Sequence, residues 1–239
     1  MRRKPGESSG ACANPCGAEK EGEQKRKADN SLPEPPSGLG KRQKRTINLL
    51  LHHAGERKHV KIGNNSDNSV KFGKTNLTSS VIACCEPVPV GHKVWYEISI
   101  QKMGDISVGW CLENHIVPKE NLYEIGDDES SYGFRIYSSF IFGLCHRSRS
   151  DNLEDEKIRN IKAKDISSIG VALNMVNGEI LFSVNGMWAK DKFKNVPLDV
   201  KFLPVITGSY NAAIKVNFGE KEFMYAPPDS TFQSMKDIL

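Results

Sequence analysis

The chain has 239 residues, 38% of them hydrophobic, which is enough for one sizeable core. It contains no run of eighteen apolar residues, which excludes a membrane-spanning helix. Residues 1–45 hold eleven basic and six acidic residues, whereas residues 46–239 hold 22 basic and 23 acidic residues. The overall charge of +4 therefore belongs to the N-terminal segment. The nearly neutral remainder argues against a nucleic-acid-binding face spread over it.

The first 45 residues are rich in Lys, Glu, Gly, Pro and Ser and are predicted to be a disordered basic tail. They begin MRRKPGESSG, without the apolar stretch of a secretory signal. Two basic clusters, Lys25-Arg26-Lys27 and Lys41, Arg42, Lys44 and Arg45, are typical of nuclear localisation signals. The alternatives are a solvated tail without a receptor and direct contact with nucleic acid. We expect a nuclear protein, with the cytoplasm as an additional location.

From residue 46 onward, short apolar segments recur about every ten residues, separated by turn residues. Many short strands of this spacing favour an all-β fold, a two-sheet antiparallel β-sandwich or barrel. Helix candidates are NLLLHH near residue 48 and residues 152–164, which are so charged that we expect a mostly exposed loop. The predicted strands are KVWYEISI (93–100), GDISVGWC (104–111), SSYGFRIY (130–137), SSFIFGLC (138–145), SSIGVALN (167–174), GEILFSVN (178–185), FLPVITG (202–208) and AAIKVNFG (212–219).

Two Asn-Gly pairs, Asn177-Gly178 and Asn185-Gly186, flank one of these strands. A type I′ turn needs a positive φ at both central residues, which Asn and Gly tolerate best. Both pairs are therefore predicted to form tight hairpin turns. The aromatic residues Trp95, Trp110, Trp188, Phe182 and Phe218 lie on predicted strands and are expected in the core.

Signatures of catalysis are missing from the sequence, which contains no GxSxG, P-loop, HExxH or GxGxxG motif. No second Cys/His pair with zinc-site spacing follows Cys12 and Cys16, so neither a metal nor a cofactor is expected. The chain is predicted not to be an enzyme. The rival hypothesis is a thiol enzyme or sensor built on one of Cys84, Cys85, Cys111 and Cys145, which requires a thiol with a depressed pKa.

The order of the motifs resembles the SPRY (B30.2/SPRY) domain family over about residues 56–230. The motifs are VWYEISI, GDISVGWC, IGDDESSYGF, ISSIGVALNMVNGEILFSVNG and FLPVITGSYNAAIKVNFG. The resemblance implies a concanavalin-like jelly roll over residues 46–239 that binds a protein partner, without catalysis or a small-molecule substrate, through loops at one end. IGDDESSYGF is similar to SPRY domains of RING ubiquitin ligases, but no RING cysteine pattern is present. The C-terminal end of the chain is similar to the SPRY domain of the Set1/MLL histone methyltransferase core complex. A basic pocket of that domain requires a Lys or Arg in the segment that corresponds to residues 79–90, and these residues include neither.

The resemblance places the binding surface in the loop before Val94 with His92, in the loops 113–130 and 148–165, and in the turn 209–211 beside them. We expect Tyr210 and Asn211 to contact the partner, because a loop-tip Tyr offers a large area at low entropy cost; the alternative for Tyr210 is a strand-end packing residue. Asp127 and Asp128 could bind a basic peptide or a cation, or simply be solvated. Arg135 and Arg147 could meet an acidic partner, or be solvated as well. Nucleic acid is expected to contact only the basic tail, in a chromatin-associated subunit for example.

Overall fold

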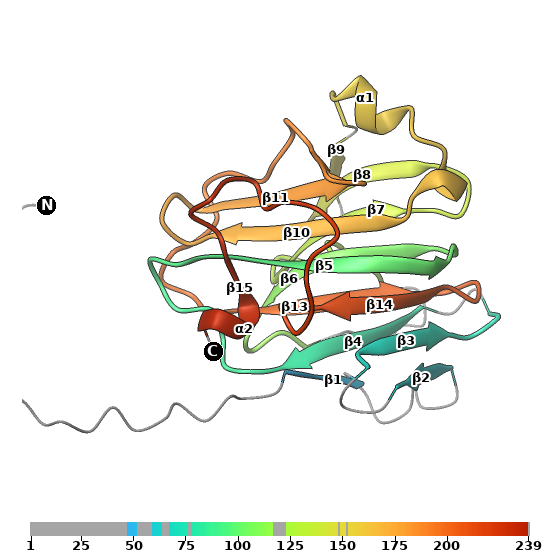
Figure 1. Cartoon of the computed structure of the whole chain (residues 1–239), viewed down its shortest axis with the longest axis horizontal. Helices are drawn as coiled ribbons and strands as arrows, with labels where there is room; N and C mark the ends of the chain where they lie inside the picture. Colours follow the sequence, from blue (N-terminus) through green and yellow to red (C-terminus); the bar gives the residue numbers. More distant parts are fainter. Residues whose placement is uncertain are drawn as a thin grey trace, which may run out of the picture. The chain divides into compact units, whose positions relative to one another are not determined.

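The computed structural model describes residues 47–51, 59–63, 67–75, 78–116, 123–147, 149–151 and 153–238. Their strands form two antiparallel sheets, as predicted, and few helical residues accompany them (Figure 1). We call the sheets A and B. In spatial order, sheet A contains β1 (Asn48–Leu51), β4 (Ser79–Cys84), β13 (Phe202–Gly208), β6 (Ile106–Leu112), β7 (Ser131–Ile136), β8 (Ile141–His146) and β9 (Arg149–Asp151).

Sheet B has β5 near its middle. Its order is β12 (Met187–Trp188), β11 (Glu179–Val184), β10 (Ser168–Asn174), β5 (Lys93–Lys102), β14 (Ala213–Asn217), β3 (Ser69–Phe72) and β2 (Val60–Ile62), and β15 (Gln233–Ser234) pairs with β5 in parallel. The helices are the single turns α1 (Glu156–Arg159), η2 (Ala163–Asp165) and α2 (Met235–Ile238). Within the described residues, no helix is long and apolar enough to cross a membrane.

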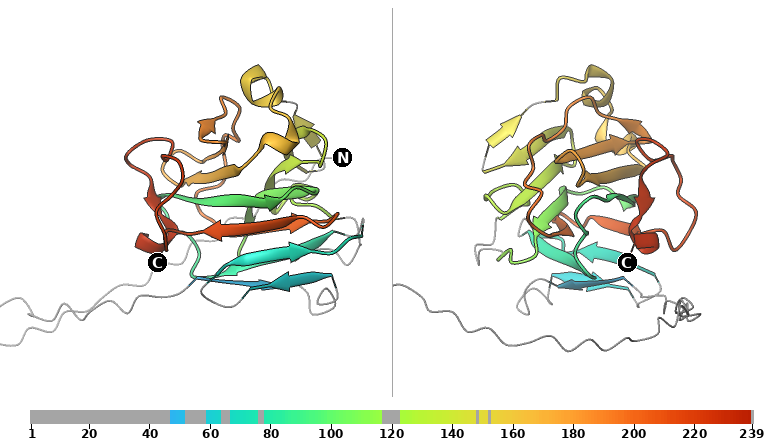
Figure 2. Two further views of the ribbon diagram at one scale, coloured as in Figure 1. Left: turned by 45° about the vertical axis from the view of Figure 1, so that its right-hand side comes forward. Right: turned by 90° about the vertical axis from the view of Figure 1, so that its left-hand side faces the viewer.

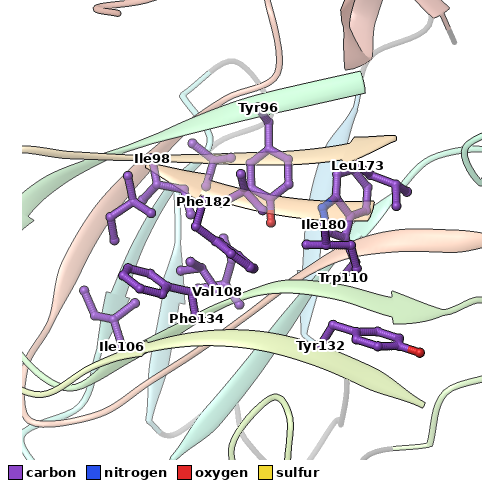
Figure 3. Packing of buried hydrophobic residues seen from close by; sticks show 14 of the residues in the cluster. Tyr96, Ile98, Ile106, Val108, Trp110, Tyr132, Phe134, Leu173, Ile180 and Phe182 are labelled. Atoms are coloured by element: carbon purple, nitrogen blue, oxygen red, sulfur yellow. The ribbon is translucent and has the colours of Figure 1, made fainter. Parts of the chain in front are cut away.

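The core lies between the two sheets, where alternate residues of each strand point inward (Figure 3). Phe134 of sheet A stacks against Phe182 of sheet B with ring centroids 5.3 Å apart. The hydroxyl of Tyr96 in β5 donates to the carbonyl of Gly109 in β6 at 2.8 Å, so that this buried polar group links the sheets. The prediction of buried aromatic residues is confirmed for Trp95, Trp110, Phe182 and Phe218, whereas Trp188 is only partly buried.

The segment after β14 covers part of the outer face of sheet B (Figure 2, red). Phe223 packs on Trp95 with centroids 3.9 Å apart, and Trp188 donates its indole N–H to the carbonyl of Ala226 at 3.1 Å. The backbone N–H of Met224 donates to the buried carboxylate of Glu97 at 2.8 Å. This part of the outer face of sheet B is therefore covered by the protein itself.

Two local predictions were wrong. The segment NLLLHH does not begin a helix, because Asn48–Leu51 pairs with β4 as an edge strand. The pair Asn177-Gly178 is not a two-residue turn, because Asn174 pairs with Glu179 and leaves a four-residue loop in which, of the two, only Gly178 has a positive φ. The Asn174 side chain accepts the N–H groups of Val176 and Asn177 and so stabilises this wider loop.

The second pair, Asn185-Gly186, does form the predicted tight turn, with φ values of 50° and 77° and Val184 paired with Met187. The side chain of Asn185 also accepts from the backbone of Ser167 at 2.8 Å and donates to the carbonyl of Asp165 at 2.8 Å. One residue therefore closes the hairpin and anchors the chain that enters β10.

Candidate functional site

The residues predicted to bind a partner lie at two opposite ends of the sandwich. The ten residues of β5 span about 30 Å. His92 precedes β5, and its carbonyl accepts from Met175 at 2.9 Å. The turn with Tyr210 follows β13 beside the other end of β5, where Lys102 pairs with Ala213 (Figure 1). The expectation that the His92 loop lies beside this turn is therefore wrong, because the whole length of β5 separates them.

Tyr210 and Asn211 occupy the tip of the turn between β13 and β14, with φ values of 49° and 63°. Ala212 closes the turn by donating to the carbonyl of Ser209 at 3.0 Å, and Tyr210 donates its own N–H to Thr75 at 3.0 Å. The Tyr210 residue is 51% exposed, which favours the loop-tip interpretation over strand-end packing. A positive φ is uncommon for a large side chain and persists only where the surroundings enforce it.

Arg135 is buried in the outer layer of sheet A. Its Nε lies 2.7 Å from a carboxylate oxygen of Glu124, and its Nη2 donates to Asp127 at 2.9 Å and to the carbonyl of Ile125 at 3.3 Å. Burial raises the pKa of Glu124, although the guanidinium opposes the rise. The acidic partner of Arg135 is thus a loop of the same chain, so a solvated strand-end arginine is not what the structure contains.

Asp128 also has a role inside its loop. Its Oδ1 accepts the backbone N–H of Ser130 and the hydroxyl of Ser131, both at 2.9 Å, and its Oδ2 accepts the hydroxyl of Tyr123 at 3.0 Å. Asp127 and Asp128 therefore hold the loop together rather than being simply solvated. Arg147 is exposed, with a backbone N–H that donates to the carbonyl of Asp128 at 3.0 Å.

The third predicted loop, 148–165, contains α1 and η2. With residues 190–194 it lines a cavity of about 950 Å³ whose walls carry both acidic and basic side chains. Because the two charge signs are interspersed, the cavity has no single charge that would select a ligand class.

An aromatic surface next to the Tyr210 turn was missed by the sequence reasoning. Tyr137, Phe140 and Phe142, which we call the aromatic hairpin, lie where β7 connects to β8. The ring of Tyr137 lies 5.3 Å from those of both Phe140 and Phe142. Phe140 is 50% exposed. The available signal was the strand period, since Tyr137 falls on the same outward face as Ser131 and Arg135.

Asp105 joins the aromatic hairpin to the Tyr210 turn. Its carboxylate accepts the backbone N–H of Ser138 at 2.8 Å, and its carbonyl accepts the N–H of Ser209 at 3.0 Å. One residue thus holds both loops by hydrogen bonds. The outer end of sheet A therefore presents two exposed aromatic side chains, Tyr210 and Phe140, on loops that a rigid sandwich positions.

Two of the described cysteine thiols, those of Cys111 and Cys145, are buried and poorly suited to chemistry. Burial raises the pKa of Cys145 to about 11 and that of Cys111 further still, so both remain protonated and weakly nucleophilic near neutral pH. Among the residues that the structure covers, no group of three or more His, Cys, Asp or Glu side chains is arranged to hold a metal ion. The basic clusters of the tail and the pair Cys12 and Cys16 lie outside the described residues.

A sandwich that presents aromatic loops at one end belongs to the class of domains that carry function in loops on a rigid scaffold. The sequence matches the SPRY domain family over residues 93–221, which is more than half of the chain. The chain belongs to the SPRY domain family, whose members are protein-interaction modules.

Similar proteins agree with this assignment. The ATP-dependent RNA helicase DDX1 of Xenopus laevis is 27% identical over 139 residues, which are 57% of this chain and 16% of the helicase. The chain thus spans about one sixth of that relative. The TRIM65 PSpry domain superposes with a TM-score of 0.53 and 12% identity over 72% of this chain and 92% of that one. Stonustoxin superposes with a TM-score of 0.51 and 14% identity over 72% of this chain and 27% of the toxin. Both structures share the fold.

Proposed function

We propose that the chain is a non-enzymatic adaptor that binds a protein partner with the Tyr210 turn and the aromatic hairpin. The observation that carries the proposal is Tyr210 itself, a large side chain that is half exposed and has a φ of 49°. The tight turn requires a positive φ at both Tyr210 and Asn211, which Gly or Asn would adopt more easily than Tyr. A large exposed side chain held in such a conformation is typical of functional sites. The raised thiol pKa values of Cys111 and Cys145 support a role without catalysis.

The variant Tyr210→Gly tests this proposal. Glycine adopts a positive φ without a steric cost, so we expect the free energy of unfolding to change by no more than about 1 kcal/mol. We also expect the partner to be lost, because the aromatic contact is removed. The measurement is affinity purification of the full chain, followed by mass spectrometry, together with urea unfolding.

The matched control is Val176→Ala, which changes a residue of similar exposure at the opposite end. The wild type and this control should recover the same partners. Recovery of those partners by Tyr210→Gly as well would show that the Tyr210 end is not the binding surface.

We further propose that the adaptor works in the nucleus, with the basic clusters of residues 25–27 and 41–45 as the import signal. A second candidate function is an RNA- or chromatin-associated subunit in which these clusters contact phosphates. It is favoured by the uneven charge of the chain and by the similarity to a protein whose name describes an RNA helicase.

Changing all seven residues of the two clusters to Gln distinguishes these functions. Import through the clusters predicts that a fluorescently tagged variant moves to the cytoplasm. Phosphate contact predicts RNA binding by the wild type that weakens steeply with salt and disappears in the variant. A variant that stays nuclear contradicts the import proposal, and RNA binding that is absent or insensitive to salt contradicts the second candidate. The residues changed are Lys25, Arg26, Lys27, Lys41, Arg42, Lys44 and Arg45.

A further inference from the structure

The aromatic hairpin already binds one guanidinium group, that of Arg135. Its Cζ lies 5.8 Å from the centroid of the Phe142 ring, and the carboxylates of Glu124 and Asp127 pair with its charge. This is the combination that stabilises an arginine at a protein surface, an aromatic face together with carboxylates. A second pair of an aromatic ring and a carboxylate lies a few residues away along the hairpin, without a guanidinium from the described residues.

This second pair consists of Phe140 and Asp105. Phe140 is half exposed, so part of its ring is accessible to a partner. The Oδ1 atom of Asp105 accepts from Ser138, and no cation in the described part of the chain pairs with this carboxylate. Asp105 lies directly before β6 and next to the hairpin, which brings the ring and the negative charge to one surface.

The charge of this surface selects the partner. Among the described residues on the outer face of sheet A, the hairpin is bordered by the carboxylates of Asp105, Glu124 and Asp127 and by the guanidinium of Arg135. Exposed lysines at the same end, Lys71, Lys74 and Lys102, lie in β3, directly after β3 and at the end of β5, and both strands belong to sheet B. The N–H of Tyr210 donates to the carbonyl of Thr75 and the N–H of Ser209 donates to the carbonyl of Asp105, so this turn lies between Lys74 and Asp105.

We propose that the partner presents an arginine-bearing segment, and that a guanidinium stacks on Phe140 and pairs with Asp105. The inference rests on the proposed function, because it assigns a chemistry to the partner of that same end. Arginine is favoured over lysine because its planar guanidinium stacks on a ring and pairs with a carboxylate at the same time, whereas an ammonium is a compact charge.

Short Gly/Ser peptides that differ only in carrying Arg, Lys or Glu at the same positions serve as probes of the full-length chain. Affinity is measured by fluorescence anisotropy, and the site is located by amide NMR shifts. Phe140→Ala should weaken binding of the Arg peptide about 4-fold, since an exposed cation–π contact is lost. Asp105→Asn keeps the acceptor for Ser138 and should weaken binding about 3-fold.

The control variants are Leu198→Ala and Asp199→Asn, which make comparable changes in the exposed segment before β13. Tighter binding of Arg than of Lys, weakened by Phe140→Ala and Asp105→Asn but not by the controls, supports the proposal. The proposal is overturned if the Arg and Lys peptides bind equally and Phe140→Ala leaves their affinities unchanged. It is also overturned if the peptides shift other amides, or if the Arg peptide does not bind. If changing the basic cluster 41–45 to Gln shifts the hairpin amides without any peptide, an internal segment is the occupant, which also overturns it.

These outcomes distinguish a failure of the arginine chemistry from a failure of the proposed function. If the Arg peptide fails while Tyr210→Gly still loses the cellular partners, the binding end is right and the arginine chemistry is wrong. If Tyr210→Gly keeps every partner, the proposed function fails first.

Discussion

Replacing Arg135 with alanine is expected to destabilise the domain by about 3 to 5 kcal/mol, because it leaves two carboxylates buried or half-buried without their cation. The side chain of Arg135 is 10% exposed and that of Glu124 is 13% exposed, so water compensates little of the lost pairing. The variant also removes the hydrogen bond from the guanidinium to the carbonyl of Ile125. Urea unfolding of the wild type and the variant measures the difference.

The loss should depend on pH in a defined direction. Burial raises the pKa of Glu124 above that of the unfolded chain. The folded state therefore binds the proton more tightly, and the resulting stability is present at acidic pH and is lost as the pH rises through the folded pKa. Without Arg135 the pKa of Glu124 rises further. The destabilisation by Arg135→Ala should therefore be smaller at about pH 5 than at neutral pH.

A double variant provides the control for this interpretation. Arg135→Met with Glu124→Gln removes both members of the ion pair and keeps the volumes similar, so it should be more stable than Arg135→Met alone. If the double variant is as unstable as the single one, the loss comes from packing rather than from an unpaired charge.

The recurrence of short apolar segments between turn residues predicted most of the fold, although β6, β7 and β10 are buried along nearly their whole length rather than at alternate residues. The segments that became β5, β6, β7, β10, β11, β13 and β14 were all predicted within a few residues. Asn48–Leu51 was misread because three consecutive leucines have no period, and only its pairing with β4 makes it a strand. The loop at Asn177 was misread because the side chain of Asn174 accepts two backbone N–H groups, which a dipeptide pattern does not contain.

The surface was harder to predict than the fold, since its residues come together only through strand pairing. The exposed turn at Tyr210 could be predicted because a turn depends on residues that are adjacent in the sequence. Phe140 and Asp105 were not, because they meet only when β6, β7 and β8 lie side by side. The burial of Arg135 could not be predicted, because nothing in its own strand reveals that the loop 123–128 covers it.

Gly133→Ala is expected to lower the free energy of unfolding by about 3 kcal/mol, because the loop 123–128 lies directly on β6 and β7. A Cβ atom at Gly133 would lie 2.4 Å from the carbonyl oxygen of Ile125, which is backbone and cannot rotate away. Gly109 faces Gly133 across β6 and β7, so neither strand carries a side chain where the loop crosses. The new methyl group would lift the loop and break the bonds that Ser107 and Arg135 donate to Ile125.

Gly91→Ala is the matched control, because nothing lies within 4 Å of its Cβ position, although its φ is 81°. It should cost only about 1 kcal/mol, the strain of a positive φ. Hydrogen exchange should increase at the amides of residues 123–131 in Gly133→Ala and stay unchanged in Gly91→Ala. Since the loop carries Glu124 and Asp127, which border the aromatic hairpin, Gly133→Ala should also weaken binding of the Arg peptide to the proposed recognition surface. Equal stability losses for the two variants would contradict this expectation, because the close approach of the loop at Gly133 would then cost no more than a positive φ at an open position.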